Sequence, residues 1–174
     1  MQLFLIRHPP PRVAAGLCYG ATDLVLAEDP RPWVGQLAAQ LPPAVPLFTS
    51  PLQRCLLPAR QLQPQAVADA RLREMDFGAW EMQSWDAIDR ASLDAWAADP
   101  LGFAPPEGES VATLKDRVLD FLAELRAAGI ATAALMTHAG VMKVIVGHAR
   151  RLPHDAWMQL AFACGDVVSV GLDP

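Results

Sequence analysis

The fold of this chain can be approached from the segment Leu3-Phe4-Leu5-Ile6-Arg7-His8-Pro9-Pro10-Pro11. Its first four residues form a short unbroken apolar run, which is typical of a strand buried on both faces. The three prolines end that strand, because proline lacks the N–H group that a central strand needs. We therefore expect Arg7 and His8 to lie just where a buried strand ends.

A second segment repeats this arrangement. The apolar run 45–48 is followed by Thr49-Ser50-Pro51, which predicts a strand and then a helix with Ser50 as its N-cap and Pro51 at its first position. Arg54 is then expected in the first turn of that helix. A polar residue again follows a buried strand.

A third segment ends in a histidine. The apolar run 132–136 leads into Thr137-His138-Ala139-Gly140 and then into the apolar run 141–146, which predicts strand, turn and helix. Apolar residues at helical spacing predict a further helix over 110–129, where Gly129 ends it, and residues 167–170 suggest a last strand.

Strands that alternate with helices predict an α/β fold with a largely parallel central sheet and helices on both faces. We expect a single domain over residues 1–174. The segment 75–109 breaks the alternation, because it is rich in Trp, Asp, Ala and Pro, and we expect it to form a small helical cap over one end of the sheet.

Composition limits the partners. The formal net charge is -5, with no run of Lys or Arg that would follow a nucleic acid or an anionic membrane surface. No stretch of about 18 apolar residues is present and the three cysteines form no C-x-x-C pair, and we expect no secretory leader. We expect a cytoplasmic protein that acts on a small molecule, without nucleic acid or membrane partners.

Because ligands of open α/β sheets bind outside the carboxyl ends of the strands, Arg7, His8, Arg54 and His138 are expected to converge. Hydrolysis of a phosphate monoester needs cationic donors for the phosphoryl oxygens, a nucleophile and a proton for the leaving alcohol. The two arginines suit phosphate oxygens, and a neutral His8 is a competent nucleophile. His138 is then expected as a charged donor. No metal or other cofactor is expected, since no carboxylate cluster is spaced for magnesium.

Four motifs in this order resemble the histidine phosphatase (phosphoglycerate mutase-like) superfamily. They are Leu5-Ile6-Arg7-His8, Ser50-Pro51-Leu52-Gln53-Arg54, the segment 73–81 (REMDFGAWE) and Thr137-His138-Ala139-Gly140. The resemblance implies that His8 is phosphorylated, that Arg7 and Arg54 bind phosphate and that His138 completes the pocket. It also makes Glu74 the proton donor to the leaving group, with Glu81 as the alternative acid.

The resemblance is inexact after the catalytic histidine. Most family members have Gly there and an Asn shortly afterwards, whereas this chain has Pro9-Pro10-Pro11 and no Asn. A cysteine phosphatase centred on Cys55 is rejected, because that chemistry requires an Arg six positions later and Arg60 lies five later.

The segment 16–26 (GLCYGATDLVL) and the proline variant of the first motif look most like the α-ribazole phosphatase branch, whose members remove a 5′-phosphate in cobalamin biosynthesis. A phosphohistidine protein phosphatase and a phosphoglycerate mutase-like enzyme are the alternatives among enzymes. A non-catalytic module that binds a phosphorylated ligand is the alternative from another class.

Overall fold

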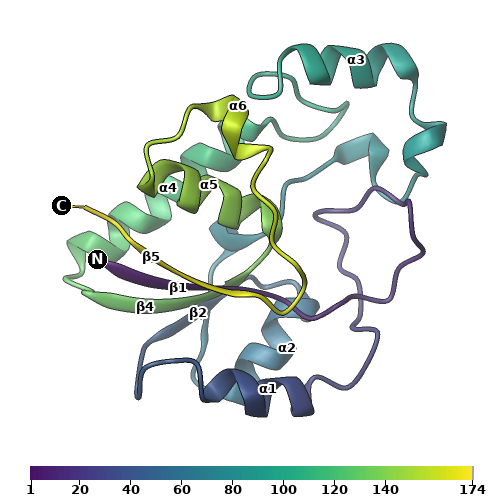
Figure 1. The fold of residues 1–174 in the computed structure, drawn as a ribbon. Helices are drawn as coiled ribbons and strands as arrows, with labels where there is room; N and C mark the ends of the chain where they lie inside the picture. Colours follow the sequence, from purple (N-terminus) through teal and green to yellow (C-terminus); the bar gives the residue numbers. More distant parts are fainter. Residues whose placement is uncertain (174) are drawn as a thin grey trace.

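The computed structural model describes residues 1–173 and contains a five-stranded sheet between two layers of helices (Figure 1). The strands lie in the order β3-β2-β4-β1-β5. β3, β2, β4 and β1 are parallel, and β5 runs antiparallel to β1. The strand bounds are Gln2–Arg7 (β1), Leu47–Thr49 (β2), Val67–Ala68 (β3), Thr132–Thr137 (β4) and Val167–Gly171 (β5).

Helices α1 and α2 cover one face of the sheet, and α4 and α5 cover the other (Figure 1). Short 3-10 turns η1, η2 and η3 connect β3 to α3. The helix bounds are Arg31–Ala38 (α1), Gln53–Leu62 (α2), Arg90–Ala98 (α3), Val111–Ala127 (α4), Ala139–Ala149 (α5) and His154–Trp157 (α6), and the turns span Ala70–Leu72, Gly78–Trp80 and Trp85–Ala87. No helix within residues 1–173 is both long and apolar enough to cross a membrane.

The unbroken apolar runs are explained by burial on both faces. In β1, Leu3 and Leu5 pack on the side of α4 and α5, while Ile6 packs on the side of α1 and α2. β4 alternates in the same way, with Leu135 on the first side and Met136 on the second. Each strand side chain therefore removes apolar surface from water on one face or the other, which is the main favourable contribution to folding.

The predicted α/β class with a largely parallel sheet is confirmed. The predicted helix start was wrong: α2 begins at Gln53, its N-cap position is Leu52, and Ser50 lies outside the helix. The reason is that the Ser50 hydroxyl contacts His138 Nε2 at 2.9 Å. The first N–H of α2 is instead accepted by the carboxylate of Asp23, 2.7 Å from the Gln53 nitrogen.

Residues 75–109 form η2, η3 and α3 around a small hydrophobic cluster that includes Trp80 and Ile88. This segment is hydrogen-bonded to the loop that follows β1: the N–H of Cys18 donates to Gln83, and the N–H of Met82 donates back to Cys18, at 2.8 and 2.7 Å. The loop after β1 and the segment 75–109 are therefore joined to each other beside the end of β1.

Candidate active site

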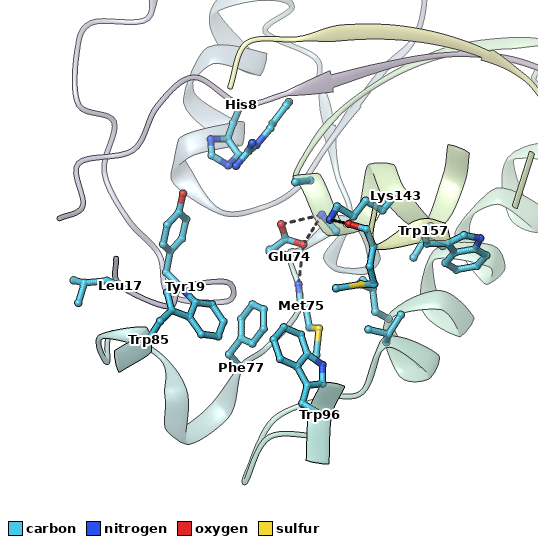
Figure 2. Close-up of a pocket in the computed structure, with 17 residues that line it drawn as sticks. His8, Leu17, Tyr19, Glu74, Met75, Phe77, Trp85, Trp96, Lys143 and Trp157 are labelled. Carbon is cyan, nitrogen blue, oxygen red and sulfur yellow. Dashed lines mark hydrogen bonds between the residues drawn. The ribbon is translucent and has the colours of Figure 1, made fainter. Parts of the chain in front are cut away.

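A cavity of about 320 Å³ opens at the carboxyl ends of β1 and β4 (Figure 2). Arg7 and His8 border it from the end of β1, Glu74 borders it from the loop after η1, and Gly140 borders it from the first turn of α5. Three of the five predicted site residues thus line one cavity.

His8 is held in a single tautomer. Its Nδ1 lies 2.6 Å from the carbonyl oxygen of Pro9, and a carbonyl only accepts hydrogen bonds, so Nδ1 carries the proton. The lone pair is left on Nε2. Burial, together with the charges of Arg54 and Arg7, lowers the pKa of His8 from 6.5 to about 3 despite the bond to Pro9. His8 is therefore a neutral imidazole with a free nitrogen lone pair at neutral pH.

Arg7 has a donor without a partner. Its Nη1 donates to the carbonyl of Phe162, in the loop before β5, and this bond fixes the side chain. Its Nε is shielded from solvent and has no hydrogen-bond partner. An unpaired buried donor costs free energy, so this N–H is an unfavourable feature of the structure as it stands.

Arg54 is fully buried, and its guanidinium lies among backbone carbonyls. Nη1 donates to Thr22 at 2.7 Å and Nη2 donates to Gly20 at 2.5 Å, while Nε donates to Nδ1 of His138 at 3.3 Å. The ring of Tyr19 lies over the guanidinium, with its centroid 5.8 Å from Cζ. The loop 19–22 therefore fixes the position of Arg54.

Glu81 holds that loop in turn. Its carboxylate accepts the N–H groups of Gly20, Ala21 and Thr22 at 3.0, 2.9 and 3.2 Å, and that of Phe77 at 3.0 Å. Burial alone would raise the pKa of Glu81, but these hydrogen bonds and the one from the Thr22 hydroxyl outweigh it, so the pKa is lowered. Glu81 is absent from the cavity lining. The structure thus places Glu81 against the loop 20–22 and Glu74 at the cavity.

His138 differs from the charged donor that was expected. Burial, followed by the charges of Arg54 and His8, holds the pKa of His138 well below its usual 6.5. Since Nδ1 accepts from Arg54, the proton lies on Nε2, which is 2.9 Å from the Ser50 hydroxyl. His138 is thus a neutral donor. Burial of the ring and the neighbouring charge of Arg54 both oppose the positive charge that was expected on His138.

Arg54 and His138 lie behind the cavity and do not line it, and both are fully buried. The ring of His138 packs edge-on against that of His8, with centroids 5.0 Å apart. The four residues from the first, second and fourth motifs are therefore brought together. Tyr19 both lines the cavity and covers Arg54.

The carboxyl group of Glu74 faces the cavity at the start of α5 (Figure 2). Both of its oxygens lie 3.1 Å from the N–H of Gly140, and Oε1 also accepts the N–H of Met75 at 3.1 Å. A Cβ atom at position 140 would collide with Oε1. The glycine of the last motif is needed so that Glu74 can approach the helix so closely.

Arg117 and Glu109 form a clamp around Glu74 that the sequence reasoning missed. The guanidinium of Arg117 binds the Glu109 carboxylate at 2.5 and 3.1 Å, and donates to the carbonyl of Glu74 at 3.1 Å. Glu109 also accepts the N–H of Asp76 at 3.0 Å. The backbone is held on both sides of Glu74. The signal available in the sequence was an acid before α4 and an Arg eight residues later, inside that helix.

Two further residues bear on the chemistry. Lys143, also missed from the sequence, lines the cavity, and its ammonium group donates to the carbonyl of Met158 at 3.1 Å. Cys55 is fully buried, and burial raises the pKa of its thiol far above the usual range, in keeping with its rejection as a nucleophile. Within residues 1–173, no three His, Cys, Asp or Glu side chains are grouped so that they could hold a metal ion.

Comparison with known proteins identifies the class. The model of the histidine phosphatase superfamily (branch 1) matches residues 3–174, and this chain belongs to that family. The family prediction is confirmed. Phosphatases of this superfamily act on small-molecule phosphates.

Several solved structures share the fold. TTHB049 from Thermus thermophilus is 31% identical, with a TM-score of 0.78, and the match covers 98% of this chain and 93% of that one. The alpha-ribazole phosphatase from Shigella flexneri is 23% identical, with a TM-score of 0.85 and coverage of 99% and 91%. A mycobacterial glucosyl-3-phosphoglycerate phosphatase is 24% identical, with a TM-score of 0.82 and coverage of 97% and 88%.

A curated relative is matched over part of its length. "Putative phosphoserine phosphatase 2" of Hydrogenobacter thermophilus is 29% identical over 107 residues, which are 58% of this chain and 53% of that protein. The match therefore spans about half the length of this curated relative.

The lowered pKa values predict that stability depends on pH. Because the folded-state pKa of His8 is about 3 and its unfolded value is near 6.5, the unfolded state binds more protons between these values. The free energy of unfolding should therefore fall as the pH falls through this window, with a slope of up to about 1.4 kcal/mol per pH unit for each such histidine. His8→Asn should make the slope shallower in urea titrations at several pH values. The exposed His148→Gln is the control and should keep the wild-type slope; equal slopes in all three proteins would contradict a neutral His8.

Proposed function

We propose that this chain is a phosphomonoesterase that forms a phosphohistidine on His8 and removes the 5′-phosphate of α-ribazole 5′-phosphate, free or attached to a cobamide. One observation carries the proposal: a nucleophilic nitrogen, a guanidinium group and a carboxyl group border one end of a cavity whose remaining wall is mostly apolar and aromatic, and a second guanidinium group, that of Arg54, is buried behind this end. The phosphate end fits the phosphoryl group, and the apolar wall fits an aromatic leaving group.

The first step transfers the phosphoryl group to the enzyme. The lone pair on Nε2 of His8 attacks phosphorus in line with the bond to the leaving oxygen. As that bond breaks, the leaving oxygen takes a proton from Glu74, so that a neutral alcohol departs. Oε2 of Glu74 accepts only from Gly140, whereas Oε1 accepts from two N–H groups, and Oε2 is therefore the oxygen that we assign to the proton.

The second step frees the histidine. Water attacks phosphorus, gives its proton to the Glu74 carboxylate, and the bond between phosphorus and Nε2 breaks. Inorganic phosphate leaves, while His8 and Glu74 return to their starting protonation states. The carboxyl group thus acts as acid in the first step and as base in the second.

The charges of the site match a phosphate dianion without a metal ion. Arg7 and Arg54 each carry one positive charge, while His8 and His138 are neutral. His138 contributes a neutral N–H donor. For Arg54 and His138 to reach the phosphoryl oxygens, the Tyr19 ring that lies over Arg54 has to move aside, and we assign it the role of a movable cover.

We infer the leaving group from the charge and the aromatic character of the side chains that line the cavity. Beyond Arg7, Lys143 is the single cationic side chain among the described lining residues, and its ammonium group is already bonded to Met158. Phosphates that bear a carboxylate would find little positive charge there. The aromatic side chains of the wall favour a planar base, and the resemblance of the segment 16–26 to the α-ribazole phosphatase branch supports the same substrate.

A phosphorylated carboxylate is the second candidate. The mycobacterial glucosyl-3-phosphoglycerate phosphatase and the Hydrogenobacter relative carry names that point to such substrates. The observation in its favour is Lys143, whose half-buried ammonium group could pair with a carboxylate if it left Met158.

We also propose that residues 75–109 act as a cap over the site within a single domain. Residues of this segment line the cavity, and the segment is hydrogen-bonded to the loop that carries Tyr19. The cysteines Cys18, Cys55 and Cys164 are all free, which suits a cytoplasmic location.

A panel of phosphomonoesters tests the substrate. We expect the highest kcat/KM for α-ribazole 5′-phosphate or its cobamide form, ahead of 3-phosphoglycerate, phosphoserine and a phosphohistidine peptide, because the cavity wall is aromatic. Activity should survive EDTA. A clear preference for a carboxylate-bearing substrate, lost in Lys143→Met, would replace the proposed leaving group and leave the phosphohistidine step intact.

The phosphohistidine is tested directly. With a rapid quench during turnover, we expect label on His8 that is stable in base and labile in acid, because Nε2 of this residue alone combines a free lone pair with a place in the cavity. His8→Ala should abolish both label and activity, while the exposed His148→Ala should keep both. A protein that binds phosphate but shows neither label nor turnover would be the non-catalytic module instead.

Leaving-group dependence tests Glu74. Glu74→Gln should slow formation of phosphoenzyme by about 10² to 10⁴-fold with alkyl phosphates, whose alkoxide needs a proton. It should slow the same step far less with p-nitrophenyl phosphate, since nitrophenolate leaves without one. Single-turnover rates separate this step from hydrolysis of the phosphoenzyme, and the exposed Glu28→Gln is the control. Equal losses with both leaving groups would remove Glu74 from the acid role.

A further inference from the structure

Two charges of opposite sign lie on either side of the loop 20–22. The guanidinium of Arg54 is fully buried, and the carboxylate of Glu81 is partly buried. Within residues 1–173, neither group forms a direct ion pair with an oppositely charged side chain. A charge that is removed from water without compensation is costly. The backbone of the loop between the two groups has to supply that compensation.

One peptide group connects the two charges directly. It joins Gly20 to Ala21, and its carbonyl oxygen accepts from Nη2 of Arg54 at 2.5 Å. Its N–H donates to Oε1 of Glu81 at 2.9 Å. Hydrogen bonds in such a chain polarise one another, so the carboxylate strengthens the carbonyl that holds the guanidinium. Arg54 and Glu81 thus form an ion pair that is mediated by a peptide group.

The bonds on either side of this peptide group reinforce it. The N–H groups of Gly20 and Thr22 donate to Oε2 of Glu81 at 3.0 and 3.2 Å. The carbonyl of Thr22 accepts from Nη1 of Arg54 at 2.7 Å. Tyr19, whose ring lies over the guanidinium, directly precedes this loop. Because Glu81 fixes the backbone from residue 20 onward, the Tyr19 side chain can move aside while the carbonyls that hold Arg54 stay in place.

We propose that Glu81 is a positioning residue for Arg54 and thereby sets the affinity of the site for the phosphoryl group, whatever the leaving alcohol. The inference rests on the proposed role of Arg54 as a phosphate ligand and deepens it, because it names the group that holds this arginine. Glu81 does not line the cavity and acts only through the loop. Since Glu81 belongs to the segment 75–109, this segment contributes to the phosphate end of the cavity as well as to its aromatic end.

Glu81→Gln removes the charge and keeps the shape of the side chain. The amide has one oxygen, which can accept from Ala21 as Oε1 does, and one NH2 group, which can only donate. That NH2 group then faces the N–H groups of Gly20 and Thr22. Donors that face each other must draw apart, and this displaces the two carbonyls that hold Arg54.

A double-mutant cycle tests the inference through the binding of inorganic phosphate, measured by calorimetric titration. Glu81→Gln should weaken binding by about tenfold, which corresponds to the loss of one hydrogen bond to a charged group. In the Arg54→Met background the same change should have less than about a twofold effect, because no guanidinium is left to position. Arg54→Lys, which lacks the planar fork, is the background if Arg54→Met does not fold. The exposed Glu28→Gln is the control and should bind phosphate like the wild type.

Folding and turnover are separated from this measurement. Urea unfolding of each variant reports any general loss of stability. If Glu81→Gln does not fold, Thr22→Val takes its place in the cycle, because it removes only the hydroxyl bond to Oε2 of Glu81, with an expected loss of about two- to threefold. Phosphate binding needs no turnover, so the cycle decides the inference even if α-ribazole 5′-phosphate is not the substrate. Equal losses in both backgrounds, as a purely structural role would give, an unchanged affinity in Glu81→Gln, or a wild-type protein that binds no phosphate would each overturn it.

Discussion

The burial of one guanidinium group constrains the whole site. Arg54 is fully buried at the start of α2, and a buried charge is tolerated only when its donors are paired. Its partners are two carbonyls of the loop after β1 and the ring of His138 after β4. Helix α2, the β1 loop and the end of β4 must therefore all be in place before this charge is satisfied. These three elements also surround the end of the cavity where His8 lies.

Two carboxylates connect the surroundings of Arg54 and of Glu74 to the segment 75–109. Glu81 binds the N–H groups of the loop whose carbonyls receive Arg54, so loop and guanidinium are held from opposite sides. Glu109, paired with Arg117 of α4, holds the backbone around Glu74. In each case the acid binds backbone N–H groups and an arginine binds backbone carbonyls. The supporting bonds thus fall mainly on the backbone around the reacting side chains, and this is what a preorganised site requires.

The sequence predicted those features of the fold that depend on local residue patterns. The buried strands, the helix over 110–129 and the placement of His8, Arg54 and His138 after strands followed from apolar runs and turn residues. It could not predict partners that meet only in the folded chain. Asp23 binds the start of α2 from 30 residues away and displaces Ser50 from that role. The pKa of His138 likewise depends on the folded chain, because it is lowered first by burial of the ring and then by Arg54, 84 residues away.

The attachment of Glu74 has a consequence for how substrate preference can diverge. The clamp of Arg117 belongs to α4, and Gly140 belongs to α5, so the acid is fixed by the helical layer that packs on the sheet. Trp85 and Trp96 stand on separate short elements, η3 and α3, that share none of these bonds. Substitutions in η3 and α3 can therefore reshape the aromatic end of the cavity while Glu74 keeps its position. Substrate preference can therefore change through residues of η3 and α3 with little effect on the residues that hold Glu74. One fold can in this way serve different substrates.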